Sequence, residues 1–381
     1  MVDPKVVEKM LPYFNTKFGN ASSLHSLGIE AKEALESARR QIASLIGAKP
    51  KEIVFTSGGT ESNNFALKSV AFTNRDKGNH IITTKVEHKC IMKTCEWLEK
   101  QDFKITYLDV DEEGFVKPEA LEAAITDKTL IVSIIHGNNE LGTIQDLETL
   151  GKICKEKGVL FHTDACQSFT KTLLDVDKQN LDLITLNSHK IHGPKGAGVL
   201  YIRAGTKIEQ WQHGGSHEND MRAGTENIHG IVGFAEAARI ASDKKHVDHM
   251  TKLRDKLIKG ILEIPDSRLN GPQGDKRLCN NTNFSFAQVE GEAIGGYLDQ
   301  KGISSSTGSA CSAKILEPSY VLQAIGLTDE EANGSLRLTL SRFTKEEDVD
   351  YVLEELPKII KKLRGFSPLA KVANYVLKKN T

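Results

Sequence analysis

The segment LITLNSHKIHGPKGAGVLY, residues 183–201, contains two apolar runs of strand length separated by a polar, glycine-rich turn. Such runs, bounded by glycine and proline, predict strands at 182–186 and 198–202. Lys190 follows the first run directly after a histidine. At this point three interpretations of Lys190 are open: a surface amine, a phosphate ligand or the anchor of a covalently bound cofactor.

Apolar runs of strand length alternate with longer amphipathic stretches in the segments around this one. The alternation is typical of a doubly wound, mostly parallel sheet covered by helices. It predicts a large α/β domain over residues 1–245, whose first few residues are open to assignment to either domain, and a smaller α+β domain over 246–381. The other expected strands of the large domain are 52–57, 80–84, 105–110, 130–135 and 159–165. The expected helices include 30–46, 61–72, 147–158, 248–264 and 346–365.

Composition limits the partners of the chain. Its 381 residues include 50 Lys and Arg against 51 Asp and Glu, which gives a net charge of -1. A balanced charge offers no overall field for nucleic acid or an anionic membrane. No apolar stretch reaches the roughly 18 residues that span a bilayer, and MVDPKVVEKM has no signal-peptide core. We therefore expect a cytoplasmic protein that acts on a small molecule.

The six cysteines are widely spaced, which does not resemble a secreted disulfide scaffold or a zinc site. We expect no metal, and we expect most of these thiols to be buried and inert. Cys311 differs, because its flanks in SSSTGSACSAK are serine, glycine and threonine and predict an exposed loop.

Polar residues follow several of the predicted strands, and ligands of open α/β sheets bind beyond the carboxyl ends of strands. Each residue alone also fits a structural role, as a glycine turn, a helix cap, a core histidine or a turn asparagine. Asp164 is the least ordinary, because its strand is apolar and a buried carboxylate needs a cationic partner. The residues at these positions are Gly59, Thr60, His88, Asn139 and Asp164.

Together with Lys190, these positions match what pyridoxal 5′-phosphate requires from a protein. A lysine amine forms a Schiff base, an aspartate keeps the pyridine nitrogen protonated, and a helix start binds the phosphate. No single element is specific, but their order and joint placement are.

Eight motifs, in order over about residues 2 to 370, carry a family resemblance: FTSGGTESNN, VEHKC, HGNNELGTIQ, HTDACQS, SHKIHGPKGAGVLY, GGSHENDMRAGTEN, STGSACS and SLRLTLSRFT. The chain resembles the NifS/IscS-type cysteine desulfurases, which are fold-type-I pyridoxal phosphate enzymes of the class V aminotransferases. The resemblance implies a homodimer with its active site at the subunit interface.

The resemblance also implies residue roles. Lys190 is the Schiff-base lysine, Asp164 the partner of the pyridinium, Gln167 a donor to the phenolic oxygen, and His88 the ring that stacks on the cofactor. Asn139 and Arg337 hold the substrate carboxylate. The remaining implied cofactor contacts are Gly59, Thr60, Asn139, Asn187, which stands where related sequences commonly carry serine, His189 and Thr225 of the partner subunit.

The implied reaction converts L-cysteine to L-alanine and leaves a persulfide on Cys311, with Lys190 and His88 moving protons. An iron–sulfur scaffold or another sulfur-acceptor protein then receives the sulfur. Two alternatives stay open at the level of sequence. One is a selenocysteine lyase or other β-lyase of the same fold, and the other is a non-enzymatic docking partner in iron–sulfur assembly.

Overall fold

The computed structural model describes residues 1–307 and 318–366. These residues form two compact units. The first comprises Met1–Asp109, Val116–Gly137 and Gln145–Lys244, and the second comprises Val110–Phe115, Asn138–Ile144 and the chain from Lys245 onward. No helix in this part of the chain is long and apolar enough to cross a membrane.

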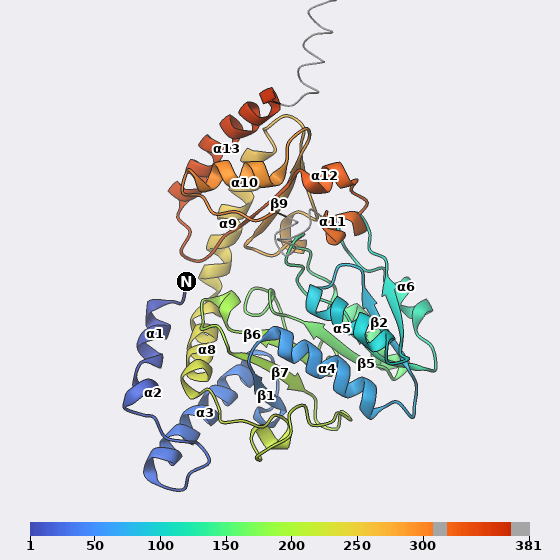
Figure 1. Cartoon of the computed structure of the whole chain (residues 1–381), viewed down its shortest axis with the longest axis vertical. Helices are drawn as coiled ribbons and strands as arrows, with labels where there is room; N and C mark the ends of the chain where they lie inside the picture. The colour runs from blue at the N-terminus through green and yellow to red at the C-terminus, as the bar shows by residue number, and fades with distance from the viewer. Residues whose placement is uncertain (308–317, 367–381) are drawn as a thin grey trace, which may run out of the picture. The chain divides into compact units, whose positions relative to one another are not determined.

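A seven-stranded sheet organises the first unit, in the order β1-β7-β6-β5-β4-β2-β3 (Figure 1). All seven strands expected from the sequence are present, and the α/β class with a mostly parallel sheet is confirmed. Only β7 runs antiparallel to its neighbours β1 and β6. The strands are β1 Ile53–Thr56, β2 His80–Thr84, β3 Lys104–Leu108, β4 Thr129–Ser133, β5 Leu160–Asp164, β6 Leu183–Asn187 and β7 Gly198–Ile202.

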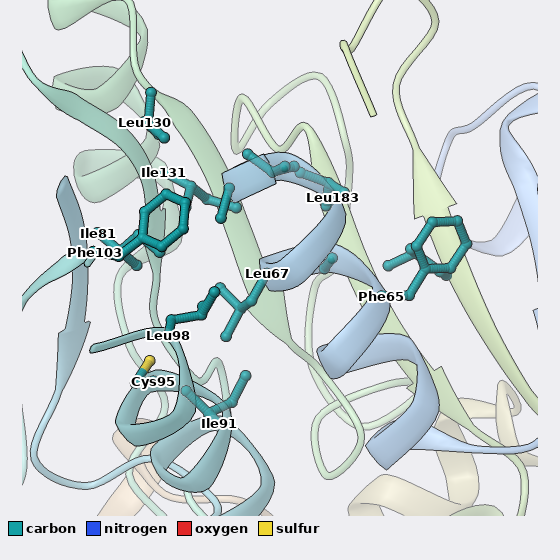
Figure 2. Close-up of a cluster of buried hydrophobic side chains, with 14 of the residues drawn as sticks. Phe65, Leu67, Ile81, Ile91, Cys95, Leu98, Phe103, Leu130, Ile131 and Leu183 are labelled. Atoms are coloured by element: carbon teal, nitrogen blue, oxygen red, sulfur yellow. The ribbon is translucent and has the colours of Figure 1, made fainter. Parts of the chain in front are cut away.

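Burial explains why these runs form strands. Every residue of β4, β6 and β7 is buried, as expected for strands covered by helices, whereas the edge strand β3 is half-exposed. Side chains of helices α4 (Gly59–Thr73) and α5 (Lys89–Glu99) complete this core. Figure 2 shows Leu67 of α4 and Leu98 of α5 in the same cluster as Ile81 and Ile131 of the strands.

Most long helices of the first unit begin at a side-chain cap. His25 caps α3, Asp146 caps α7 and Asn227 caps α8, each by accepting a backbone N–H of the first turn. Gly158, at φ 67°, ends α7 in the left-handed conformation that glycine favours. The remaining helices of this unit are α1 Pro4–Met10, α2 Pro12–Asn15, α3 Ser26–Leu45, α6 Pro118–Ala124, α7 Leu147–Lys157 and α8 Ile228–Ala241.

The second unit contains a three-stranded antiparallel sheet in the order β10-β9-β8. Phe284, Leu336 and Leu356 lie in its core and are fully buried. Its strands are β8 Ser267–Leu269, β9 Asn281–Phe286 and β10 Ser335–Thr339, and its helices are α9 Lys244–Ile261, α10 Gly291–Asp299, α11 Tyr320–Ala324, α12 Asp329–Asn333 and α13 Glu346–Phe366.

Two short segments differ from the expected division at residue 245, because 110–115 and 138–144 belong to the second unit. The backbone explains the second of them. Leu278 N–H donates to the Gly142 carbonyl at 2.7 Å, and Ile144 N–H donates to the Lys276 carbonyl at 2.9 Å. Asn139 therefore lies in the second unit.

Candidate active site

Asp164 ends β5 and is 4% exposed. Its Oδ2 accepts the Asn63 Nδ2–H at 2.7 Å, and its Oδ1 accepts the Cys166 backbone N–H at 2.9 Å. It forms no ion pair with any residue that the structure describes. The cation expected from the sequence is therefore not a described side chain within salt-bridge distance, and the hydrogen bonds that stabilise the carboxylate come from neutral donors.

Asn63 was not singled out from the sequence. It lies on α4 one turn before Leu67 and two turns before Val70, and all three side chains are buried. An asparagine on the apolar face of a helix is the signal that could have found it, because a buried amide needs polar partners.

The turn from β1 into α4 is shaped by two glycines. Gly58 has φ 151° and ψ -179°, a conformation that glycine alone adopts readily. A Cβ on Gly59 would lie 2.6 Å from Cys166 Sγ and 3.6 Å from Asn187 Nδ2. No described side chain caps α4, so its first N–H groups stay available to an anion next to the exposed Thr60.

Lys190 lies in a short helical turn, His189–Ile191, that follows β6. Its backbone N–H donates to Asn187 Oδ1 at 3.4 Å, and Asn187 itself is buried. The side chains of His189 and Lys190 are exposed. Partial desolvation of the ring, and then the positive charges of Lys190 and Lys195, lowers the pKa of His189 below its ordinary value.

Cys166 connects Lys190 with Asp164. Burial and then the charge of Asp164 raise the pKa of the Cys166 thiol well above its ordinary value, whereas the charge of Lys190 lowers it. Both charges therefore act on one thiol. The structure thus brings Gly59 and Asp164 next to Cys166, with Asn187 beside Gly59, while Lys190 affects this thiol through its charge.

His88 begins helix α5. Its Nδ1 accepts the Cys90 backbone N–H at 3.2 Å, which caps the helix. An acceptor nitrogen carries no proton, so the ring proton lies on Nε2. Glu87, directly before it, is fully buried, and its Oε1 accepts the Ile135 N–H at 2.8 Å and the Thr84 hydroxyl at 2.9 Å.

Two predicted cofactor ligands of the first unit use no side-chain polar group in a hydrogen bond, although the Gln167 backbone carbonyl accepts from Lys171 Nζ at 2.7 Å. Gln167 is half-buried and Thr225 is exposed, and neither side chain forms a hydrogen bond with a described residue. Arg222 Nε pairs with Glu61 Oε1 at 3.0 Å, which ties the segment that carries Thr225 to helix α4.

The two predicted substrate ligands meet within the second unit. Arg337 Nη1 donates to the Asn139 carbonyl at 3.1 Å, and its Nη2 donates to Ser306 Oγ at 3.1 Å. Asn281 Nδ2 donates to the same Asn139 carbonyl at 3.2 Å. Asn281 was also missed from the sequence, where it reads as an ordinary strand residue.

Cys311 lies outside the described residues. The other five cysteines form no disulfide with a described residue, and three of them are buried. Burial raises the pKa of Cys90 and of Cys154 to about 12 and raises that of Cys95 further. Thiols with such raised pKa values stay protonated at neutral pH and are poor nucleophiles, in line with the expectation from the sequence.

The model of the class V aminotransferases matches residues 1–352. The chain belongs to the class V aminotransferase family. It is 50% identical over 370 residues to the cysteine desulfurase IscS of Clostridium botulinum, covering 96% of this chain and 93% of that protein. The cysteine desulfurase IscS of Dictyoglomus turgidum is 52% identical over 367 residues, with coverage of 96% and 93%.

Solved structures of class V relatives have the same fold. A NifS-like protein superposes with a TM-score of 0.89 at 38% identity, covering 94% of this chain and 96% of that chain. SspA in complex with cysteine superposes with a TM-score of 0.80 at 36% identity, covering 90% and 97%. The resemblance found in the sequence motifs is thereby confirmed over nearly the whole chain.

Class V aminotransferases of this kind depend on pyridoxal 5′-phosphate, and two observations show that the site fits this cofactor. The start of α4 offers N–H groups that no described side chain caps, and a Cβ on Gly58 in the same turn would meet no atom within 4 Å. The buried Asp164 carboxylate has no salt bridge with a described residue, so it suits the protonated nitrogen of a pyridine ring.

Proposed function

We propose that this protein is a cysteine desulfurase, which converts L-cysteine to L-alanine and transfers the sulfur to Cys311. The observation that carries the proposal is the buried Asp164 with neutral donors only, one of which, Asn63, lies on α4 near its open start. The identity of about half of all aligned residues to the IscS cysteine desulfurases supports this substrate.

The first unit would hold the cofactor. Lys190 would bind it covalently, Asp164 would accept the ring N–H, and Gln167 would donate to the phenolic oxygen. The phosphate would lie at Gly59 and Thr60, near Asn187 and His189, with Thr225 of the partner subunit. When bound, pyridoxal phosphate draws electrons from the Cα of an attached amino acid, which is chemistry that no side chain supplies.

Proton transfer falls to Lys190 and His88. The free Lys190 amine can take the proton from the substrate Cα, because Asp164 keeps the electron acceptor in its protonated form. His88 uses Nδ1 for the helix cap, so Nε2 is the ring nitrogen that can exchange a proton. The helix cap thus determines which nitrogen of the His88 ring can transfer a proton.

The second unit would bind the substrate carboxylate and carry the Cys311 loop. Arg337 presents a planar guanidinium that suits two hydrogen bonds to a carboxylate. Its present partners, the Asn139 carbonyl and Ser306 Oγ, hold it in the middle of β10. The division into a cofactor unit and a substrate unit is part of this proposal.

The transfer of sulfur from the substrate to Cys311 requires no external oxidant. The Cys311 thiolate attacks the substrate sulfur, an S–S bond forms and the Cβ–S bond breaks. The electron pair of the broken bond stays on Cβ, which takes a proton and becomes the methyl group of alanine. Cys311 ends as a persulfide, which an iron–sulfur scaffold or another acceptor protein would consume.

A cytoplasmic homodimer completes the proposal. Several apolar side chains of the N-terminal segment are exposed, which supports a partner surface there. These include Leu11 at 56%, Phe14 at 56%, Phe18 at 64% and Leu24 at 94%. A second subunit would cover such a surface and supply Thr225 to the cofactor phosphate.

The test compares the wild type with Cys311→Ser and Lys190→Ala after addition of pyridoxal phosphate. We expect a coloured wild type that releases alanine and sulfide from cysteine, a coloured but inactive Cys311→Ser, and loss of the covalent cofactor absorbance in Lys190→Ala. Full turnover in Cys311→Ser indicates a selenocysteine lyase or other β-lyase instead. A wild type that binds no cofactor contradicts the enzyme proposal and favours a docking role.

A further inference from the structure

Cys90 lies between two residues of the candidate site. Its Sγ is 3.0 Å from His88 Nδ1 and 3.1 Å from Asn63 Nδ2. Asn63 in turn donates to Asp164 Oδ2 at 2.7 Å. The contacts form one continuous chain of polar groups, His88–Cys90–Asn63–Asp164, all within the first unit.

The direction of each hydrogen bond in this series of polar groups follows from Asp164 at its end. The Asp164 carboxylate only accepts, so the Asn63 amide must turn its nitrogen toward it. The second hydrogen of the same nitrogen then points to Cys90 Sγ, which acts as an acceptor. The thiol hydrogen of Cys90 is left to donate, and His88 Nδ1 is the acceptor within reach.

His88 Nδ1 therefore receives two donors from one residue, the Cys90 backbone N–H at 3.2 Å and the thiol at 3.0 Å. Both interactions require an unprotonated Nδ1 and so place the ring proton on Nε2. A backbone N–H alone would also cap the helix, but the thiol adds a second donor that fixes the rotation of the ring.

We propose that Cys90 is a positioning residue, whose thiol fixes the tautomer and ring orientation of His88 and connects this ring to Asp164 through Asn63. The inference rests on the proposed function only for its consequence in catalysis. The contacts themselves are properties of this chain without the cofactor.

A nucleophilic role for Cys90 is disfavoured by its surroundings. Burial, followed by the charge of Asp164, raises the pKa of this thiol to about 12. The thiol therefore keeps its proton at neutral pH, which is what a donor requires and what a nucleophile cannot have. Cys95 offers a matched control, because it is a buried thiol of the same helix that packs among apolar side chains.

The experiment compares Cys90→Ala, Cys90→Ser and the control Cys95→Ala in protein labelled with ¹⁵N in the histidine rings. The His88 signals are assigned with His88→Gln. Since one hydrogen bond contributes about three- to tenfold to an equilibrium, Cys90→Ala should lower the ratio of the Nε2–H to the Nδ1–H tautomer by that factor. Cys90→Ser keeps a donor and should stay within about twofold of the wild type, as should Cys95→Ala.

Kinetics with cysteine supply the second readout. In Cys90→Ala we expect kcat to fall about three- to tenfold while KM for cysteine stays within about twofold, with recovery in Cys90→Ser. An unchanged tautomer ratio in Cys90→Ala, a serine variant that behaves like alanine, or a shifted ratio with unchanged kcat each overturns the proposal. A wild type that releases no alanine refutes the desulfurase activity, and with it the expected effect of Cys90 on kcat. In that case the tautomer ratio of His88 still shows whether the Cys90 thiol donates a hydrogen bond to Nδ1.

Discussion

Helices α4 and α5 both begin shortly after a strand of the same sheet, yet their first turns are completed in opposite ways. At α4 a glycine stands in the cap position and no described side chain accepts the first N–H groups. At α5 the His88 ring accepts one of them. Every helix start has this same shortage of acceptors. At α4 the unpaired N–H groups remain available to a ligand, and at α5 a side chain accepts one of them.

This difference indicates that the two similar turns have different functions. The open start of α4 has the donors that an anion needs, and a Cβ on Gly58 would meet no atom within 4 Å, whereas Gly59 packs too closely against Cys166 to carry a side chain. The closed start of α5 uses one nitrogen of His88 for structure and leaves the other for chemistry. Two kinds of substitution test this difference in function. One adds an acceptor at the start of α4, and the other removes the cap at the start of α5.

The largest effect is expected from closing the α4 start with a negative charge. In Gly59→Asp, the new carboxylate would accept the N–H groups of the first turn and repel a phosphate. We expect the affinity for pyridoxal phosphate to fall by about 100-fold or more, since a charged donor–acceptor set is lost. A titration followed by cofactor absorbance measures this change.

A matched control separates charge from bulk. Gly59→Ala alone places a Cβ 2.6 Å from Cys166 Sγ, whereas the double variant Gly59→Ala/Cys166→Ala removes that sulfur. The double variant should bind the cofactor better than Gly59→Ala and far better than Gly59→Asp. Equal affinity in all three variants contradicts an anion site at this turn.

The turn before α5 provides the second prediction, through Glu87. Burial raises the pKa of this carboxyl from 4.5 to about 8. Between these two pH values the folded protein holds a proton on Glu87 that the unfolded chain has released. The contribution of Glu87 to the free energy of unfolding is therefore fully present below pH 4.5 and is lost as the pH rises to about 8. We expect the free energy of unfolding to fall over this window by roughly 2 to 4 kcal/mol.

Glu87→Gln is the control for this pH dependence. Glutamine retains an oxygen that can accept the Ile135 N–H and the Thr84 hydroxyl, but it has no proton to release. Urea unfolding at pH 5 and pH 8 should show a smaller decline in the variant than in the wild type. An equal decline in both proteins contradicts the burial of a neutral carboxyl behind His88.

The strands could be predicted from the sequence because helices cover the sheet and make its strands continuous apolar runs. The direction of β7 could not, since local pattern carries no information on pairing partners. Nor could the segment 138–144 be placed, because hydrogen bonds to residues far along the chain bring it into the second unit.

The candidate site was predictable at the positions where strands end, and it was not predictable where helices contribute. Asp164 and Lys190 follow strands, which is a signal that any open α/β sheet provides. Asn63 lies on α4, whose packing beside β5 brings it to the carboxylate, and Cys90 lies on α5 and is connected to the carboxylate only through Asn63. The cap at His88 also escaped notice, because histidine is an uncommon residue for this position.

The smallest expected effect comes from opening the α5 start. His88→Ala removes the cap and should lower the free energy of unfolding by about 1 kcal/mol, whereas His88→Asn supplies a short side chain that caps well and should restore it. Urea unfolding of the cofactor-free protein measures both. Turnover should fall in both variants by about 10- to 100-fold, because neither retains an imidazole Nε2. Recovery of stability without recovery of turnover would separate the two nitrogens of His88 by function, and an asparagine variant no more stable than alanine would show that the cap contributes nothing.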